Sequence, residues 1–259
     1  MKVVAEASVK PGDLSGQVAL VTGGAGGIGA AICEVLAGAG VTVLVGFSSG
    51  KARAEALAAR LPGPGPHRAL RAQVDRSETL ERAAQEVRAR EGRLDILVNN
   101  AGITTPVAHA DLEGLTDAWF DTIMQVNVRG VFACTRAFAP LLRSSGRGLV
   151  VNLSSIAGRT GLGSNVAYCA SKAALDSLSR SLGRALAPEI RVLSVSPGWV
   201  DGEYAGQMPA ELLEAQAALT PLGRIAQAEE VARAVLACAT HLTFSTGCVI
   251  AVDGGRPLG

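Results

Sequence analysis

A glycine-rich turn joins an apolar run to a helical pattern near the start of this chain. Val18–Val21 is typical of a buried strand, and apolar residues recur at helical spacing from Ile28 onward. The turn between them is Thr22-Gly23-Gly24-Ala25-Gly26-Gly27-Ile28-Gly29. Its glycines allow a tight turn, close backbone approach to a pyrophosphate and close packing of the helix on the sheet. Because a helix N-terminus also offers unpaired N–H groups, the turn predicts a dinucleotide site in a parallel α/β fold.

Apolar runs and helical stretches alternate along the rest of the chain. Such alternation indicates right-handed strand–helix–strand units, and unbroken apolar strands are expected where helices cover both sheet faces. We therefore expect a Rossmann-type doubly wound parallel sheet of about seven strands with helices on both faces. No linker divides the chain, so we expect one domain over residues 1–259, with residues 1–14 as an N-terminal extension. The predicted strands are 18–21, 41–45, 68–74, 94–99, 148–153, 191–195 and 248–252, and the predicted helices are 28–38, 51–61, 77–90, 117–142, 168–186 and 229–238, with a loop at 156–166 and irregular or weakly helical chain at 198–220.

Charge and cysteine usage exclude several function classes. The formal net charge is +1 and basic residues alternate with glutamates along the helices, so we expect no nucleic-acid partner. The first sixteen residues lack the apolar core of a secretory signal, and no apolar run approaches the ~18 residues of a membrane span. The five cysteines and three histidines show no metal-ligand spacing, so no metal site is predicted. These features predict a cytoplasmic protein with reduced thiols and no membrane partner.

Further motifs follow the turn in a fixed order. The turn itself has the spacing Thr-Gly-x-x-x-Gly-x-Gly, which differs from the commonest dinucleotide fingerprint. Over residues 15–257 the chain resembles the short-chain dehydrogenase/reductase family. The resemblance implies an NAD(P)(H)-dependent oxidoreductase that interconverts a ketone and a secondary alcohol. The motifs that carry it after the turn are Asn99-Asn100-Ala101-Gly102, Asn127, Ser155, Tyr168-x-x-x-Lys172, Pro197-Gly198 and Val252-Asp253-Gly254-Gly255.

Tyr168 and Lys172 lie four residues apart on one predicted helix and therefore share a face. A free phenol has a pKa of about 10, and a nearby ammonium group favours the phenolate, so Tyr168 is the candidate general acid or base. Ser155 follows the fifth predicted strand, where a parallel sheet presents its ligand crevice. The resemblance implies that Ser155, rather than its neighbour Ser154, holds the substrate oxygen. It also implies that Lys172 binds the nicotinamide ribose and that Asn127 positions a water that relays protons to Lys172.

The resemblance, together with the turn, supplies a set of candidate cofactor-binding residues along the carboxyl ends of the predicted strands. In NAD-specific relatives an acidic residue ends the second strand, and here that position is Phe47. No carboxylate stands there to repel a 2′-phosphate, and Lys51 or Arg53 can supply positive charge, so NADP(H) is favoured while NAD(H) stays possible. The candidate set is Thr22, Gly23, Gly27, Ile28, Gly29, Phe47, Ser48, Ser49, Lys51, Gln73, Val74, Asn100, Ala101, Gly102, Tyr168, Lys172, Pro197, Gly198 and Val200.

Two positions depart from the family pattern. Gln73-Val74 stands where relatives often have Asp-Val beside the adenine, and an amide can still bond the adenine edge. Relatives usually carry a threonine five residues after the proline of Pro-Gly, where it holds the nicotinamide carboxamide. That position is Gly202 in this chain, with Asp201 and Glu203 on either side as possible substitutes.

The segment from Trp199 to Leu219 is expected to form a substrate lid. Its general form is similar to that of 3-oxoacyl-carrier-protein reductases, but no basic cluster for an acidic carrier protein is evident. A free ketone, a β-keto ester and a secondary alcohol all stay open as the small-molecule substrate. The candidate pocket residues are Trp199, Tyr204, Met208, Ile103, Gly161 and Asn165.

The favoured interpretation is an NADPH-dependent carbonyl reductase of the 3-oxoacyl type. An NAD-dependent alcohol, sugar or steroid dehydrogenase is the alternative within enzymes, and a non-catalytic NADP(H)-sensing regulator is a distant one. Relatives usually form tetramers by pairing two long helices and the C-terminal strand, so we expect a homotetramer with a dimer as the alternative. We expect the short tail at residues 256–259 to reach a neighbouring subunit.

Overall fold

The computed structural model describes residues 14–63, 65–202 and 205–258. Its centre is a seven-stranded sheet in the order β3-β2-β1-β4-β5-β6-β9, and every neighbouring pair of these strands is parallel. The order reverses between β1 and β4, which is the point where doubly wound sheets open a ligand crevice. The expected fold class is confirmed. The strands are β1 (Val18–Val21), β2 (Thr42–Phe47), β3 (Arg68–Arg71), β4 (Ile96–Asn99), β5 (Gly148–Leu153), β6 (Ile190–Pro197) and β9 (Val249–Val252).

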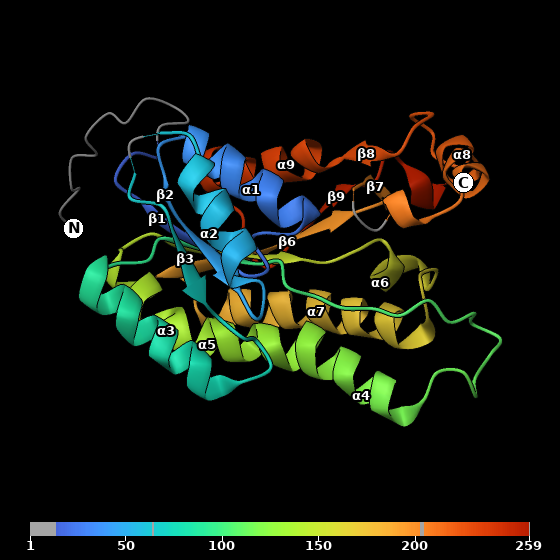
Figure 1. The fold of residues 1–259 in the computed structure, drawn as a ribbon, viewed down its shortest axis with the longest axis horizontal. Helices are drawn as coiled ribbons and strands as arrows, with labels where there is room; N and C mark the ends of the chain where they lie inside the picture. Colours follow the sequence, from blue (N-terminus) through green and yellow to red (C-terminus); the bar gives the residue numbers. More distant parts are fainter. Residues whose placement is uncertain (1–13, 64, 203–204, 259) are drawn as a thin grey trace.

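Helices cover both faces of this sheet, so the molecule has three layers (Figure 1). Helices α1, α2 and α9 pack on one face, and α3, α5 and α7 pack on the other. Because both faces are covered, β1, β4 and β5 are buried along their whole length and consist mainly of aliphatic residues. The helices are α1 (Gly27–Gly38), α2 (Lys51–Arg60), α3 (Ser77–Arg90), α4 (Asp117–Met124), α5 (Gly130–Ser144), α6 (Ala157–Thr160), α7 (Val166–Ala185), α8 (Ala210–Ala218) and α9 (Ala228–Thr240).

Two local predictions were wrong, and a third, irregular or weakly helical chain at 198–220, missed one short strand. The third strand ends at Arg71 rather than Val74, because its partner β2 ends at Phe47, which is paired with Arg71. The loop predicted at 156–166 contains the one-turn helix α6, which is too short to show an apolar period. The segment 198–220 contains α8 and also β7 (Val200–Asp201), which pairs with β8 (Ala226–Gln227) in a separate two-stranded sheet.

The single helix predicted over 117–142 is divided in the structure. A π-helical turn at Gln125–Arg129 separates α4 from α5, and the helical chain continues to Ser144. A π turn inserts one residue into the helical ladder and commonly marks a functional position. Its consequence here is the placement of Asn127, described below.

The predicted N-terminal extension falls on residues outside the described part of the chain except for Leu14. That side chain is buried in the core, and its amide donates to Ala39 O at 3.0 Å. Among the described residues, no helix is both long enough and apolar enough to cross a bilayer.

Candidate active site

The glycine-rich turn leads from β1 directly into α1. Gly23 has φ +61°, a left-handed value that favours glycine. A Cβ on Gly29 would lie 2.4 Å from Gly23 O and 2.7 Å from Asn100 Nδ2, so a larger residue does not fit there without a shift. The N-cap residue of α1 is Gly26, which has no side chain to accept hydrogen bonds from the first N–H groups of the helix. Glycine backbone and a helix N-terminus together form a cradle that fits a pyrophosphate.

Two side chains hold this turn in shape. The buried Thr22 hydroxyl accepts hydrogen bonds from the amides of Asn100 and Ala101, both at 3.1 Å. Asn100 Nδ2 in turn donates to Thr22 O at 3.0 Å and to Gly23 O at 3.1 Å. The ends of β1 and β4 are therefore tied together on either side of the crevice.

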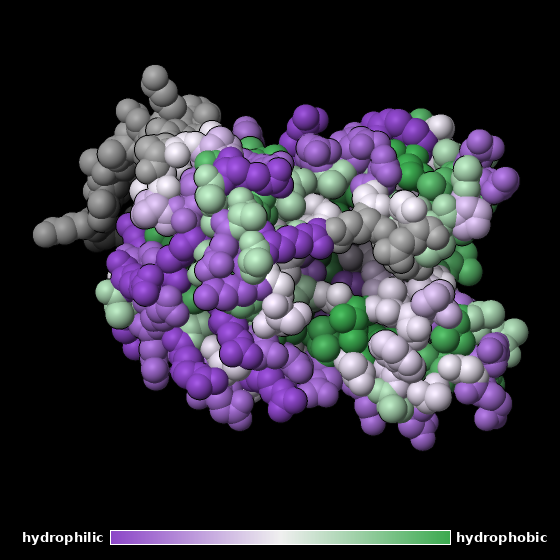
Figure 2. Space-filling view, in the orientation of Figure 1, coloured by the Kyte–Doolittle hydropathy of each residue, from purple (hydrophilic) through white to green (hydrophobic). Residues whose placement is uncertain are grey.

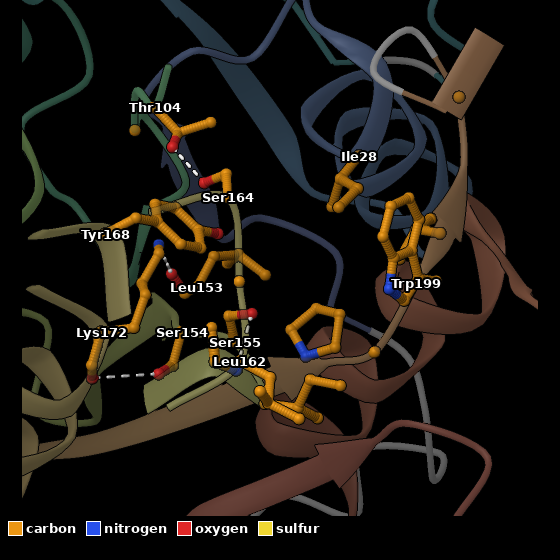
Figure 3. Close-up of a pocket in the computed structure, with 18 of the residues that line it drawn as sticks. Ile28, Thr104, Leu153, Ser154, Ser155, Leu162, Ser164, Tyr168, Lys172 and Trp199 are labelled. Carbon is orange, nitrogen blue, oxygen red and sulfur yellow. Dashed lines mark hydrogen bonds between the residues drawn. The ribbon is translucent and has the colours of Figure 1, made fainter. Parts of the chain in front are cut away.

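Tyr168 and Lys172 lie in the first half of α7. Asn165 caps this helix, because its Oδ1 accepts from the Tyr168 amide at 2.7 Å. Lys172 Nζ lies 5.5 Å from the Tyr168 ring centroid and donates to Leu153 O at 2.7 Å (Figure 3). Burial lowers the pKa of Lys172 to about 8, although the negative charge of Asp176 opposes that change. The ammonium group beside Tyr168 therefore loses its proton at a lower pH than a solvent-exposed lysine would, while it keeps its charge below about pH 8.

The two serines after β5 have different surroundings. Ser155 is half-buried, and its Oγ accepts from the Ala157 amide at 3.2 Å at the start of α6. Ser154 is buried, and its Oγ donates to Lys172 O at 3.4 Å. Both line the cavity described below, but Ser154 is turned toward the α7 backbone. This arrangement favours Ser155 as the hydroxyl that meets a substrate.

Asn127 projects from the π turn into a buried position. Its Nδ2 donates to Ile103 O at 3.0 Å and to Ser171 Oγ at 3.1 Å, and its Oδ1 accepts from Ile103 N at 2.9 Å. A Cβ on Gly102 would lie 3.3 Å from Asn127 Oδ1 and 3.7 Å from Lys172 Nζ. The side chains of Asn127 and Lys172 therefore both lie close to Gly102, although Asn127 does not line the cavity itself.

A cavity of about 1150 Å³ connects the glycine-rich turn to Tyr168 and to the lid. In Figure 2 the surface is hollowed on this side of the molecule, and apolar side chains gather around the hollow. Tyr168 and Lys172 lie on one side of the cavity in Figure 3, with Ile28 and Trp199 opposite them. The cofactor candidates that line it are Gly27, Ile28, Gly29, Asn100, Gly102, Tyr168, Lys172, Pro197, Gly198 and Val200, and the pocket candidates that line it are Ile103, Trp199 and Met208.

Several candidates lie elsewhere. Thr22, Gly23 and Ala101 shape the turn without lining the cavity, and Gln73 and Val74 lie beyond the end of β3. Gly161 is also outside the lining, and Asn165 acts as the cap of α7. Tyr204 and Glu203 fall outside the described residues.

The region after β2 is open and exposed. Phe47 ends the strand, and Ser48 and Ser49 follow it on the surface. Lys51 Nζ lies 3.6 Å from Glu55 Oε1, and both side chains are exposed. Arg53 instead lines a second, smaller hollow beside the glycine-rich turn, together with Ala25 and Gly27.

Two pairs of residues that line the cavity were not predicted from the sequence. Thr104 and Ser164 share a hydrogen bond between their hydroxyls at the rim beside Tyr168, and Asn165 Nδ2 donates to Thr104 Oγ1 at 3.3 Å. At the other end of the cavity, Gln216 and Arg256 are joined by a 2.7 Å hydrogen bond. Residues 104 and 164 lie far apart in sequence, as do residues 216 and 256, and no spacing links either pair.

Comparison with known proteins places the chain in a family. A family model described as enoyl-(acyl carrier protein) reductase matches residues 23–256. The rhamnolipids biosynthesis 3-oxoacyl-(acyl-carrier-protein) reductase of Pseudomonas aeruginosa is 38% identical over 251 residues, which cover 93% of this chain and 96% of that protein. This protein belongs to the short-chain dehydrogenase/reductase family.

Two further relatives show the range of the family. Cis-4-hydroxycyclohexanecarboxylate dehydrogenase of Sinomonas cyclohexanicum is 37% identical over 247 residues, covering 92% of this chain and 96% of its own. A solved short-chain dehydrogenase/reductase, described as glucose/ribitol dehydrogenase, from Brucella melitensis superposes with a TM-score of 0.87 at 27% identity, covering 94% and 98% of the two chains. As a family member, the protein is an NAD(P)-dependent oxidoreductase that acts on CH–OH and C=O groups.

Proposed function

We propose that this protein is an NADPH-dependent carbonyl reductase that converts a ketone, of the 3-oxoacyl type or a simpler analogue, into a secondary alcohol. The observation that carries the proposal is the convergence of Tyr168, Ser155 and Lys172 on a cavity that also reaches the glycine cradle at α1. Relatives named as 3-oxoacyl-(acyl-carrier-protein) reductases support this direction of reaction.

The proposed mechanism divides proton transfer and positioning among four residues. NADPH, held by the glycine cradle and Lys172, would supply the hydride for the carbonyl carbon and leave as NADP⁺. Tyr168 donates the proton to the carbonyl oxygen, while the Ser155 hydroxyl holds that oxygen beside it. Lys172 stabilises the resulting phenolate by its charge and then gives up a proton that restores the Tyr168 hydroxyl. Asn127, bonded to Ile103 on one side and Ser171 on the other, fixes the wall behind Lys172 and positions a water that returns a proton to it.

The remaining cofactor contacts follow from the same cradle. Gly27, Ile28 and Gly29 would offer backbone N–H groups to the pyrophosphate, and Asn100, Gly102 and Lys172, which line the same cavity, would hold the nicotinamide ribose. For the adenosine 2′-phosphate we favour Arg53 over Lys51, because Arg53 lines the small hollow that also contains Gly27, whereas Lys51 lines neither hollow. Ser48 and Ser49 supply exposed hydroxyls at the end of β2.

Nicotinamide absorbance with NADPH and NADH over a panel of β-keto esters, simple ketones and diketones tests the proposal. Turnover that favours NADPH is the expected result. Arg53→Ala should raise the KM for NADPH more than that for NADH, whereas the matched variant Lys51→Ala should change both little. Equal use of the two cofactors by the wild type contradicts the NADPH preference but leaves ketone reduction intact.

An NAD-dependent alcohol dehydrogenase is the second candidate. The similarity to cis-4-hydroxycyclohexanecarboxylate dehydrogenase favours it, as does the lack of a basic residue within the glycine-rich turn itself. Oxidation of secondary alcohols with NAD⁺, faster than any ketone reduction with NADPH, would establish this candidate instead.

We also propose a cytoplasmic homotetramer. Large apolar side chains on α4 and α5 are about two-fifths exposed in the single chain, namely Trp119, Phe120 and Phe132. Surfaces of this kind mark contacts between subunits. Light scattering should give four times the chain mass, and a monomeric mass would contradict the proposal.

A further inference from the structure

Arg256 stands out among the residues that line the cavity. Of the described lysines and arginines only two line it, Lys172 and Arg256. Lys172 belongs to the catalytic group, whereas Arg256 lies with Met208, Leu212 and Gln216 of the lid. The cavity therefore has a second positive charge away from the glycine cradle.

The guanidinium group of Arg256 is held only by neutral acceptors among the described residues. One terminal nitrogen donates to Gln216 Oε1 at 2.7 Å, and the other donates to Leu219 O at 3.4 Å. Its Nε is buried and has no hydrogen-bond partner within the described chain, and no ion pair with a described carboxylate is formed by Arg256. The side chain as a whole is half-buried, and the buried Nε is a polar group whose burial is costly unless a hydrogen-bond acceptor completes its surroundings.

The neighbouring carboxylate does not fill that role. Asp201 also lines the cavity, but it is exposed, and its Oδ2 accepts from Gln227 Nε2 at 3.5 Å. Apolar residues line the same cavity, including Leu212 and Pro257. An apolar wall that ends at an arginine fits a carbon skeleton that ends in an anionic group, because the planar guanidinium binds carboxylates with paired hydrogen bonds.

We propose that Arg256 is a specificity-determining residue that binds the carboxylate of an oxo-acid or hydroxy-acid substrate. The proposal rests on the proposed function, since it assumes that the carbonyl end of the same molecule meets Tyr168 and Ser155. Arg256 donates a hydrogen bond to the amide oxygen of Gln216 on α8. The proposed anion site is therefore joined directly to the lid.

Matched acids and esters test this proposal in the intact enzyme with NADPH and, separately, with NADH. The substrates are 3-oxobutanoate, 4-oxopentanoate and 4-oxocyclohexanecarboxylate, each compared with its methyl ester. At least one acid should exceed its ester in kcat/KM. Arg256→Gln should lower kcat/KM for that acid by about 10- to 100-fold, mainly through KM, while changing the ester by less than about threefold.

Two further variants separate charge from lid packing. Arg256→Lys keeps the charge without the planar fork, so it should retain part of the preference for the acid. Arg159→Gln removes the same charge from an exposed position on α6 outside the cavity and should leave both substrates unchanged. An equal loss for acid and ester in Arg256→Gln, or no preference for any acid in the wild type, would overturn the proposal.

If no substrate in the panel is turned over, that result counts against the proposed function. A binding measurement still tests the anion site in that case. Cyclohexanecarboxylate carries the anion without a carbonyl group. Ligand-observed NMR on the NADP⁺-saturated protein should detect its binding to the wild type and lose it in Arg256→Gln. No binding to the wild type, or equal binding to both proteins, would refute the anion site.

Discussion

The catalytic wall, which consists of Ser155, Tyr168 and Lys172 with Asn127 outside the lining, faces the lid across the cavity. The residues of the wall are fixed more firmly than those of the lid. Asn127 and Lys172 are 1% and 6% exposed, and each bonds to backbone atoms of another segment. By contrast, α8 of the lid has no buried residue, and Leu212 is 37% exposed. A reaction needs fixed proton donors, whereas substrate choice tolerates a surface that can adjust. We therefore expect changes in the wall to alter kcat, and changes in the lid to alter KM.

The Tyr168→Phe variant should give the largest effect. It removes the proton donor while keeping the ring, so kcat should fall by about 10²- to 10⁴-fold with little change in melting temperature. Leu212→Ala on α8 is the matched lid variant and should change KM with kcat within a few-fold. Steady-state kinetics and thermal melting of both variants check this. A Tyr168→Phe enzyme with near-normal kcat would remove Tyr168 from the mechanism.

Gly29→Ala tests how tightly the cofactor side of the cavity is packed. The added Cβ would lie 2.4 Å from Gly23 O, so the turn must shift. We expect a loss of about 1–3 kcal/mol in the free energy of unfolding and weaker NADPH binding. Gly38→Ala at the end of the same helix has no atom within 4 Å of its Cβ and should change stability by at most about 1 kcal/mol. Urea denaturation and fluorescence titration of NADPH compare the two; equal behaviour would contradict the packing argument.

The pH profile of ketone reduction should reflect Lys172. Its pKa is lowered to about 8 by burial, so the ammonium charge is present below pH 8 and is lost as pH rises through that value. The rate should fall over the same range. Asp176→Asn removes a carboxylate that raises this pKa, so the falling limb should move to lower pH. Asp121→Asn, at an exposed position on α4, is the control and should leave the profile unchanged. A falling limb that stays in place in Asp176→Asn would show that Lys172 does not set it.

The wall could be predicted from sequence because its residues lie within local motifs. Tyr168 and Lys172 are one helical turn apart, and Ser155 follows β5, a strand that is buried along its whole length and mainly aliphatic. The π turn that holds Asn127 was not predicted, since a single turn of five residues is too short to show a period of its own. Asn127 was found through family resemblance alone.

The lid could not be predicted in the same way. Helix α8 has no buried face, so its sequence lacks the apolar period that marks a packed helix. Arg256 meets Gln216 across forty residues, and only the folded chain shows that contact. Long-range contacts of this type carry the proposed substrate specificity, which explains why the sequence left the substrate open.

Gly202→Thr gives the smallest expected effect and sharpens the contrast with Gly29. Gly202 lines the cavity at the position where relatives carry threonine, and a Cβ there would meet no atom within 4 Å. The added hydroxyl can bond the nicotinamide carboxamide, so the Kd for NADPH should fall by roughly 2- to 10-fold, as expected for one neutral hydrogen bond. Gly206→Thr, also in the lid and also without close neighbours, lies outside the cavity lining and should leave the Kd unchanged.

We expect tighter NADPH binding in Gly202→Thr alone, and melting temperatures near that of the wild type in both variants. That result would show that the lid accepts a new side chain where the glycine-rich turn does not. If Gly202→Thr destabilised the protein as much as Gly29→Ala, the lid would be as tightly packed as the wall, and the distinction between them would fail.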